Sequence, residues 1–356
     1  SEGHVEFLPD IMQGLWLGKP IWAWVGFLLL IGILIVLDLS VMHKAGHGAV
    51  EIKESMYMCA FYTGLGISFA GVIYWLYGPS IPVTMADMLT ETDAGDRGWR
   101  AAMLYLTGYF VEMSLSMDNV FVISLIFGYF HVPRQYQHRV LFWGIIGVIV
   151  LRALLIGMGV AIISNFHWMM TVFGVFLVYA GVKMLLAKTE TAPDVGRNPV
   201  LKFIRKHYPV TSEFHGEKFF VRLRLAEGQK PVTHMTPLFL ALVMVELADV
   251  VFAVDSVPAI FAITPDPFLV YTSNIFAIIG LRALYFTLAA LVHKFEYLKF
   301  ALALILVLIG AKILLNTLLR VQFPEWLTLL ATLSLLGGGI AWSLVKNGRA
   351  GRKSEP

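Results

Sequence analysis

The stretches of sequence that decide the fold are Val111–Val120, VEMSLSMDNV, and Ala248–Val257, ADVVFAVDSV. Each contains an acidic residue, five intervening residues, an Asp, and then Asn or Ser followed by Val. Both lie inside long apolar runs, where an ionised carboxylate costs several kcal/mol unless it faces a partner or a water-filled path. We therefore predict that the paired acids form a cation site where two related segments meet.

The composition places both segments in a membrane. The 356 residues are 58% hydrophobic and 14% charged, with a mean hydropathy of +0.74, whereas a soluble domain carries about 25% charged residues. The net charge of +3 does not indicate a nucleic-acid partner. The single cysteine, Cys59, excludes a disulfide framework and a thiolate metal cluster. We expect a protein of the lipid bilayer with no enzymatic activity and no permanent cofactor.

Apolar runs of about 20 residues are long enough to cross the bilayer core. By this measure we predict nine transmembrane helices, at residues 20–42, 56–77, 101–130, 139–164, 168–187, 235–262, 269–292, 299–319 and 325–345. The third run is too long for a simple crossing, so we expect it to begin before the membrane or to tilt. The predicted fold class is an all-α polytopic membrane protein.

The basic residues indicate which side of the membrane each loop faces. One predicted side holds 19 Lys and Arg, in Lys299 and the loops 43–55, 131–139, 188–234, 293–298 and 346–356. The opposite side holds four. Because Lys and Arg are enriched in cytoplasmic loops, we predict that the N-terminus lies outside and the C-terminus lies in the cytoplasm.

An internal repeat relates the third to fifth spans to the sixth to eighth. Besides the acidic motifs, LRAL at 151–154 recurs at 281–284, and GVKMLL at 181–186 recurs as GAKILL at 310–315. Each unit has three spans, and the linker between the units stays on one side, so the two units must be inverted in the membrane. Inverted repeats with a site at the bilayer midplane are typical of secondary transporters.

The repeat divides the chain into five regions. These are an N-terminal region with two spans and an extracytoplasmic acidic loop at 1–100, repeat A at 101–188, a cytoplasmic linker at 189–234, repeat B at 235–319, and a C-terminal span with a basic cytoplasmic tail at 320–356. In the linker, Asn198 and Pro199 predict the start of a short basic helix that runs through His207. The alternation over 218–225 and a turn at Gly228 indicate a β-hairpin. Its basic surface suits anionic lipid or a protein partner, or is simply solvated.

The acidic motifs have two alternative explanations. Six acids fall within predicted spans, namely Asp38, Glu112, Asp118, Glu246, Asp249 and Asp255, and four bases accompany them, namely Arg152, Lys183, Arg282 and Lys312. If all the bases pair internally, two negative charges remain, which one divalent cation or two protons would balance. Alternatively, the acids only pair with Arg152 and Arg282, while Lys183 and Lys312 snorkel to the interfaces.

The residue types favour a hard cation. Glu112, Ser116 and Asn119 share one helix face, and Ser256 accompanies the acids of the second motif. Pro258 should kink its helix and free a carbonyl beside Asp255. Such oxygen ligands suit Mg²⁺, Ca²⁺ or Mn²⁺ rather than Zn²⁺ or Cu²⁺. Two further residues stay open: Asn274 is either an extra ligand or an interhelical hydrogen bond, and Asp38 is either part of the site or a cytoplasmic-end ion pair.

Several stretches resemble the TerC family of bacterial membrane proteins, which includes the Alx-type manganese exporters. They are VEMSLSMDNVFV, VELADVVFAVDSVPAIFA, TSNIFAIIGLRAL, the pair GVKMLL and GAKILL, and EKFFVR, and the likeness runs from the first span to about the eighth. The resemblance implies export of Mn²⁺ across the bacterial inner membrane, a fold of two inverted three-helix units with extra helices, and in some members a link to tellurite resistance. The metal-site residues that it implies are Glu112, Asp118, Asn119, Glu246, Asp249, Asp255 and Ser256.

Two classes of function remain. The first is a secondary transporter that exports Mn²⁺, or another divalent cation such as Ca²⁺ or Mg²⁺, in exchange for protons. Arg152 and Arg282 would hold the acids in place, or occupy them when the metal leaves. The second is a membrane assembly or metallation factor that docks a protein partner through its cytoplasmic linker. Direct transport of the tellurite anion fits worst, because an acidic site repels an anion.

Overall fold

Nine long helices make up most of the part of the chain that the structure describes. The computed structural model describes residues 14–17, 19–44, 52–78, 94–166, 168–186, 195–224, 231–288, 298–319 and 323–351. The long helices are α2 (Ile21–Lys44), α3 (Ile52–Tyr77), α5 (Ala94–Tyr129), α6 (Arg134–Asn165), α7 (Met169–Leu186), α9 (Pro237–Ile263), α10 (Pro267–Leu288), α11 (Leu298–Leu319) and α12 (Glu325–Gly351). The smaller described elements are the strands β1 (Leu15–Trp16), β2 (Lys19–Pro20), β3 (Phe220–Leu223) and β4 (Val232–Met235), and the helices η1 (Val195–Arg197) and α8 (Pro199–His207).

Seven of these helices are long and apolar enough to cross a membrane within the described residues: α3, α5, α6, α7, α9, α11 and α12. The apolar parts of α2 and α10, Ile21–Leu37 and Pro267–Gly280, are shorter. The architecture is therefore that of an all-α polytopic membrane protein, as predicted, while nine crossings stay a prediction. The third predicted span is the 36-residue helix α5. It begins at Ala94, with Asp96 in its first turn, and is therefore longer than the predicted span, as expected.

Polar caps followed by prolines start α8, α9 and α10. Thr236 precedes Pro237 in α9 and accepts a hydrogen bond from the Phe239 N–H, and Asp266 precedes Pro267 in α10 and accepts from Phe268 N–H. This sequence satisfies an orphan N–H and puts proline where no N–H is needed. Within α9, Pro258 does not end the helix, which continues to Ile263. The chain thus remains helical beside the second acidic motif, and the bend expected there is still a prediction.

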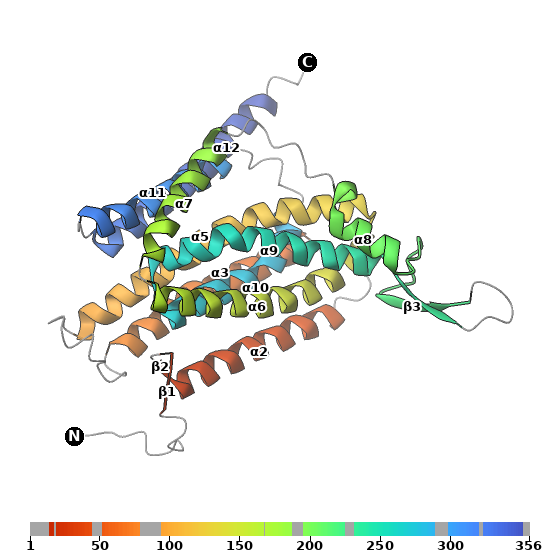
Figure 1. Cartoon of the computed structure of the whole chain (residues 1–356), viewed down its shortest axis with the longest axis horizontal. Coiled ribbons are helices and arrows are strands. Elements are labelled where there is room, and N and C mark those ends of the chain that lie inside the picture. Colours follow the sequence, from red (N-terminus) through yellow and green to blue (C-terminus); the bar gives the residue numbers. More distant parts are fainter. Residues whose placement is uncertain are drawn as a thin grey trace.

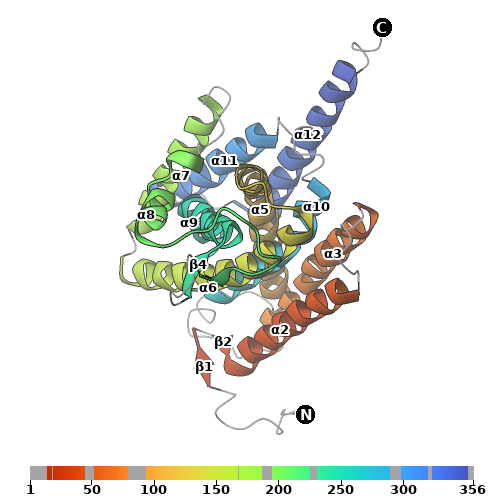
Figure 2. The same cartoon turned by 90° about the vertical axis from the view of Figure 1, so that its right-hand side faces the viewer.

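The helices that carry the acidic motifs lie at the centre of the bundle. Figure 1 shows the long helices running roughly side by side, with α8 and the β3–β4 hairpin at one end. In the end-on view of Figure 2, α2 and α3 lie on one side of the bundle and α7, α11 and α12 on another. Helix α5 contacts α3, α9, α10 and α12, and α9 contacts α5, α6, α7 and α11. The buried faces of the acidic motifs therefore pack against other helices.

The outer helices expose large apolar side chains, as expected of a surface that faces lipid. Leu29 on α2 is 63% exposed, Leu318 on α11 is 68% exposed, and Trp342 on α12 is 65% exposed. A soluble monomer rarely leaves so much apolar surface uncovered. The central helix α9 also has an open face, because Val251 and Val254 are 63% and 59% exposed.

Helices α7 and α11 approach each other through a glycine on each side. A Cβ atom added to Gly181 would lie 2.6 Å from Ala303 O, 2.7 Å from Val307 Cγ2 and 3.0 Å from Val307 N. A Cβ atom added to Gly310 would lie 2.8 Å from Gly174 O, and 2.9 Å from both Val178 Cγ2 and Val178 N. Each glycine therefore meets the residues that correspond to the neighbours of the other, at a constant sequence offset of 129 between α7 and α11. The two contacts are reciprocal. Small residues let membrane helices pack at backbone distance in this way.

The cytoplasmic linker predicted from the sequence contains the two elements expected there. Asn198 caps α8 by accepting a hydrogen bond from Val200 N–H, and the helix ends at His207. Strands β3 and β4 form an antiparallel hairpin, with Phe220 opposite Met235. The side chain of Leu201 is 1% exposed and packs with apolar residues from α5, α6 and α9. The α8 segment is therefore docked on the bundle rather than extended away from it.

Replacing Gly310 with Ala should destabilise the protein, because the added methyl group meets backbone atoms of α7 that cannot move aside cheaply. We expect a loss of about 1–3 kcal/mol, as for other overpacked sites, and a similar loss for Gly181→Ala. Gly71→Ala on α3 is the matched control, because nothing lies within 4 Å of its added Cβ atom. Thermal unfolding in detergent, followed by tryptophan fluorescence, would measure all three. Equal midpoints for G310A and G71A would contradict the close contact.

Candidate cation site around Arg152

The centre of the site is Arg152, a charged side chain in the middle of helix α6. Only 1% of it is exposed, and by volume it is the largest fully buried side chain among the described residues. A guanidinium can be buried at this depth only if partners compensate for the water that it has lost. Its neighbours therefore show which polar groups the fold brings together.

Arg152 draws its partners from three other helices. Its Nη1 atom lies 2.7 Å from Glu112 Oε1 of α5. Its Nε and Nη2 atoms donate to Asp249 Oδ2 and Oδ1 of α9, at 3.5 Å and 3.4 Å. Nη1 also donates to Asn274 Oδ1 of α10 at 2.9 Å. The two acidic motifs, far apart in the sequence, thus meet at one guanidinium.

The charges in this cluster do not cancel. Glu112 and Asp249, both buried, face a single guanidinium, so one negative charge is left over when both acids are ionised. Neither oxygen of Glu112 accepts a well-oriented hydrogen bond in the described part of the chain. The pairing is therefore not one base for one acid, and the cluster can still attract a cation.

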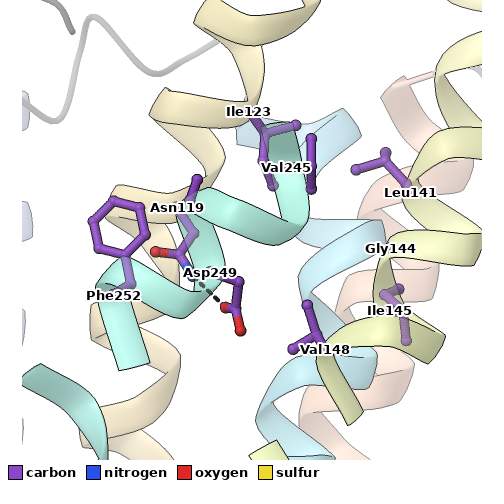
Figure 3. A pocket seen from close by; sticks show the side chains of 10 residues that line it. Asn119, Ile123, Leu141, Gly144, Ile145, Val148, Val245, Asp249 and Phe252 are labelled. Carbon is purple, nitrogen blue, oxygen red and sulfur yellow. Dashed lines mark hydrogen bonds between the residues drawn. The ribbon is translucent and has the colours of Figure 1, made fainter. Parts of the chain in front are cut away.

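A small cavity adjoins the cluster. Figure 3 shows Asn119 of α5 pointing toward Asp249 of α9, and Asn119 Nδ2 donates to Asp249 Oδ1 at 3.2 Å. The inner space of about 20 Å³, lined also by Gly144, Val245 and Phe252, is large enough for one water molecule or one small ion. Asn119 Oδ1 is buried and has no hydrogen-bond partner in the structure. Such an oxygen is rare in a protein interior and is a candidate ligand.

The third acid, Glu246 of α9, lies in a notch made by two glycines of α6. A Cβ atom added to Gly147 would overlap the Glu246 carboxyl group, at 2.5 Å from Cδ and 2.6 Å from Oε2. A Cβ atom added to Gly144 would lie 3.9 Å from Glu246 Oε1, an ordinary contact. Glu246 Oε2 is buried, and no described residue forms a hydrogen bond with it. Gly147 therefore gives the carboxyl group the room that it needs beside α6.

Two hydroxyl groups predicted for the site are also buried. Ser116 is 2% exposed and Ser256 is 1% exposed, and neither Oγ atom has a hydrogen-bond partner in the structure. However, the described residues contain no group of three Asp, Glu, His or Cys side chains close enough to hold a metal ion. The structure thus brings Glu112, Asp249, Asn119 and Asn274 together around Arg152, without forming a closed ligand shell.

The remaining predicted residues divide into two groups. The side chains of Asp118, Asp255, Arg282 and Asp38 lie outside the described residues. Lys183 is exposed one turn before the end of α7, as expected of a snorkelling lysine. Lys312 instead forms an ion pair with Glu325 of α12, with Nζ 2.6 Å from Oε2. Neither lysine contacts the cluster around Arg152, so neither has the supporting role in the site that we predicted for it.

Two contacts of the site were not predicted from the sequence. One is the glycine notch, and its signal was the spacing of Gly144 and Gly147 in an otherwise bulky apolar span. The other is the partner of Asn274: of the two roles predicted for this residue, the structure shows the interhelical hydrogen bond, with Arg152 as the donor. Both depend on how α6, α9 and α10 are rotated against one another.

Arg152→Gln should destabilise the protein by about 3–5 kcal/mol, because it leaves two buried carboxylates without their counter-charge. Adding Glu112→Gln should recover part of that loss, since one of those charges is then removed as well. A double-mutant cycle on unfolding in mixed detergent and dodecyl sulfate micelles would give the coupling free energy. Additive effects of R152Q and E112Q would show that the ion pair is not energetically coupled.

Comparisons with known proteins agree with this architecture. Residues 97–350 match the family described as integral membrane protein TerC family. The chain is 40% identical to an uncharacterised membrane protein of Myxococcus xanthus, over 92% of this chain and 93% of that protein. It is 41% identical to the putative membrane-bound redox modulator Alx of Escherichia coli (strain K12), over 83% of this chain and 86% of that protein. No solved structure matches the chain. With a match over most of its length and relatives that align nearly end to end, the chain belongs to the TerC family of integral membrane proteins.

Proposed function

We propose that the protein is a secondary transporter that exports a divalent cation, most simply Mn²⁺, through the carboxylates around Arg152. The observation that carries the proposal is the surplus of buried negative charge. Among the described residues, Glu112 and Asp249 contact one buried base, Arg152, and Glu246 lies in its notch on α6 with no basic side chain in contact. Two negative charges therefore remain when all three acids are ionised. One divalent cation or two protons would balance that surplus.

An inverted repeat supports transport. The reciprocal contacts of Gly181 and Gly310 are those that a pseudo-twofold axis between α7 and α11 would produce. The pairs α5–α10 and α6–α9 are likewise equivalent under such an axis, and both are in contact. We propose that α5–α7 and α9–α11 are inverted copies within nine crossings, with the N-terminus outside and the C-terminus in the cytoplasm of a bacterial inner membrane. Transporters of this kind bind their substrate where the copies meet.

The chemistry of the cluster favours a hard cation. Its free groups are carboxylate, amide and hydroxyl oxygens, and no His or Cys side chain lies among the residues that contact Arg152. Oxygen ligands suit Mn²⁺, Mg²⁺ and Ca²⁺. Exporting a divalent cation against about 100 mV costs about 4.6 kcal/mol. Exchange for two protons removes that electrical term, because no net charge then crosses the membrane. Any link to tellurite resistance would follow indirectly from metal balance.

The test is Mn²⁺ movement by purified protein in liposomes, with and without an imposed pH gradient. We expect wild-type protein to move Mn²⁺ faster when protons can flow the opposite way. E112Q, D249N, D118N and D255N should each stop the flux, because each removes a carboxylate of the two motifs. E217Q, which alters an acid that pairs with Arg139 outside the site, is the control. Full transport in E112Q and D249N would exclude this site as the route.

Gly147→Ala should lower Mn²⁺ flux by about tenfold or more, the usual loss when a residue that orients a ligand is disturbed. Its methyl group would push the Glu246 carboxyl group out of the notch, whereas Gly144→Ala meets only ordinary contacts and should keep nearly normal flux. The two variants differ by one turn of the same helix, so a general effect of alanine on α6 would affect both. Equal flux in both would mean that the notch does not position Glu246 for transport.

A second candidate function is an assembly or metallation factor that binds a protein partner. Its support is the docked cytoplasmic segment, where Phe203 on α8 is 55% exposed beside the exposed Lys202 and Arg205. The liposome experiment separates the two, because flux without any partner favours transport.

The Alx relatives are named putative membrane-bound redox modulators. Since these 356 residues contain one cysteine, exchange of an internal disulfide is not available to them.

A further inference from the structure

Arg152 fills the space between the two acidic motifs. Nη1 lies 2.7 Å from Glu112 Oε1 of α5, and Nη2 lies 3.4 Å from Asp249 Oδ1 of α9. The two carboxylates therefore face the same planar guanidinium from two helices. Among the described residues, no third Asp, Glu, His or Cys side chain joins these two acids in a group able to hold a metal ion. A protein side chain occupies the position where a bridging ion would bind.

The guanidinium is a weaker occupant than a divalent ion would be. A guanidinium keeps its single charge in proteins, so it neutralises only half of the charge of Glu112 and Asp249. A divalent ion would neutralise both carboxylates and would approach their oxygens to about 2.0–2.6 Å. The nitrogens of Arg152 stay 3.4 Å and 3.5 Å from Asp249. A divalent cation in place of Arg152 would therefore neutralise both carboxylates, provided that Arg152 keeps another acceptor.

Asn274 is that acceptor. It is 1% exposed, and its Oδ1 atom accepts from Arg152 Nη1 at 2.9 Å. Its own Nδ2 group donates to Val270 O at 3.2 Å, which holds the amide oxygen toward Arg152. This oxygen is neutral and belongs to α10, a helix that carries neither acidic motif. The guanidinium can thus keep a hydrogen bond in the protein interior after it leaves the carboxylates.

We propose that Arg152 is a tethered cation that occupies the substrate position between Glu112 and Asp249, and that a divalent cation binds by displacing it toward Asn274. The inference rests on the proposed function, because it assumes that these carboxylates bind the transported ion. Under this proposal, either Arg152 or a divalent cation always lies between the two carboxylates, so they are never buried without a positive charge beside them. Because Arg152 links α5 to α9, its displacement also releases the two helices that carry the motifs, so cation binding and helix movement are coupled.

The experiment measures Mn²⁺ binding to purified full-length protein, with free Mn²⁺ followed by its paramagnetic resonance signal. Arg152→Ala removes the competing cation and should tighten binding by about tenfold or more, since the competent state is then always populated. Added methylguanidinium should enter the vacated space and weaken Mn²⁺ binding in R152A but not in the wild type. Methylurea has nearly the same shape without the charge and should have no effect.

Arg152→Lys keeps the positive charge, so it tests the same idea if R152A does not fold. An ammonium cannot bridge both carboxylates as the guanidinium fork does. Mn²⁺ binding should therefore tighten, by less than the roughly tenfold expected for R152A. Unchanged or weaker binding in the folded variants, without competition by methylguanidinium, would overturn the proposal and leave Arg152 as a fixed counter-ion. If D249N still stopped liposome flux, the proposed transport would stand without it. Absence of both flux and Mn²⁺ binding in every protein would overturn both.

Discussion

A single buried guanidinium connects the helices on which the rest of the structure depends. Arg152 holds Glu112 of α5, Asp249 of α9 and Asn274 of α10 within 3.5 Å. Buried ion pairs often add little net stability compared with apolar packing, but removing one partner leaves an uncompensated charge. The cluster therefore acts mainly on specificity. Any rotation of α5, α6, α9 or α10 that separated these groups would leave a charge without a partner inside the bundle.

Glycine contacts allow this arrangement, because polar groups can meet only where helix backbones come close. Gly147 leaves room for the Glu246 carboxyl group beside α6, and Gly181 and Gly310 bring α7 against α11. Association of helices in lipid depends on close packing and polar contacts, because lipid tails are as apolar as the side chains that they would replace. Small residues and buried charges thus direct the assembly of this bundle together, each at its own helix pair.

The proposed transport and the inferred displacement of Arg152 follow from the same imbalance. A site with equal numbers of acids and bases would have no net charge to attract a further cation. In the described part of the chain, one base serves two acids, while Asn119 Oδ1 and Glu246 Oε2 lie buried without a hydrogen-bond partner. Unsatisfied oxygens of this kind are uncommon unless a ligand, water or a second conformation uses them. The membership of the TerC family establishes an integral membrane protein, and the chemistry of the cluster is the reason to propose a cation as its substrate.

The sequence by itself determined that this is a helical membrane protein, and it predicted α8 from Asn198 and Pro199 and the β3–β4 hairpin from its alternation. These features depend on local properties: the length of each apolar run, caps and turns. Only the tertiary structure decided that Arg152 pairs with Asp249, 97 positions away, and that Lys312 pairs with Glu325 instead of snorkelling. The physical reason is that lipid-facing and protein-facing surfaces of a membrane helix are equally apolar. The sequence pattern therefore does not encode how each helix is rotated, and rotation decides which charges meet.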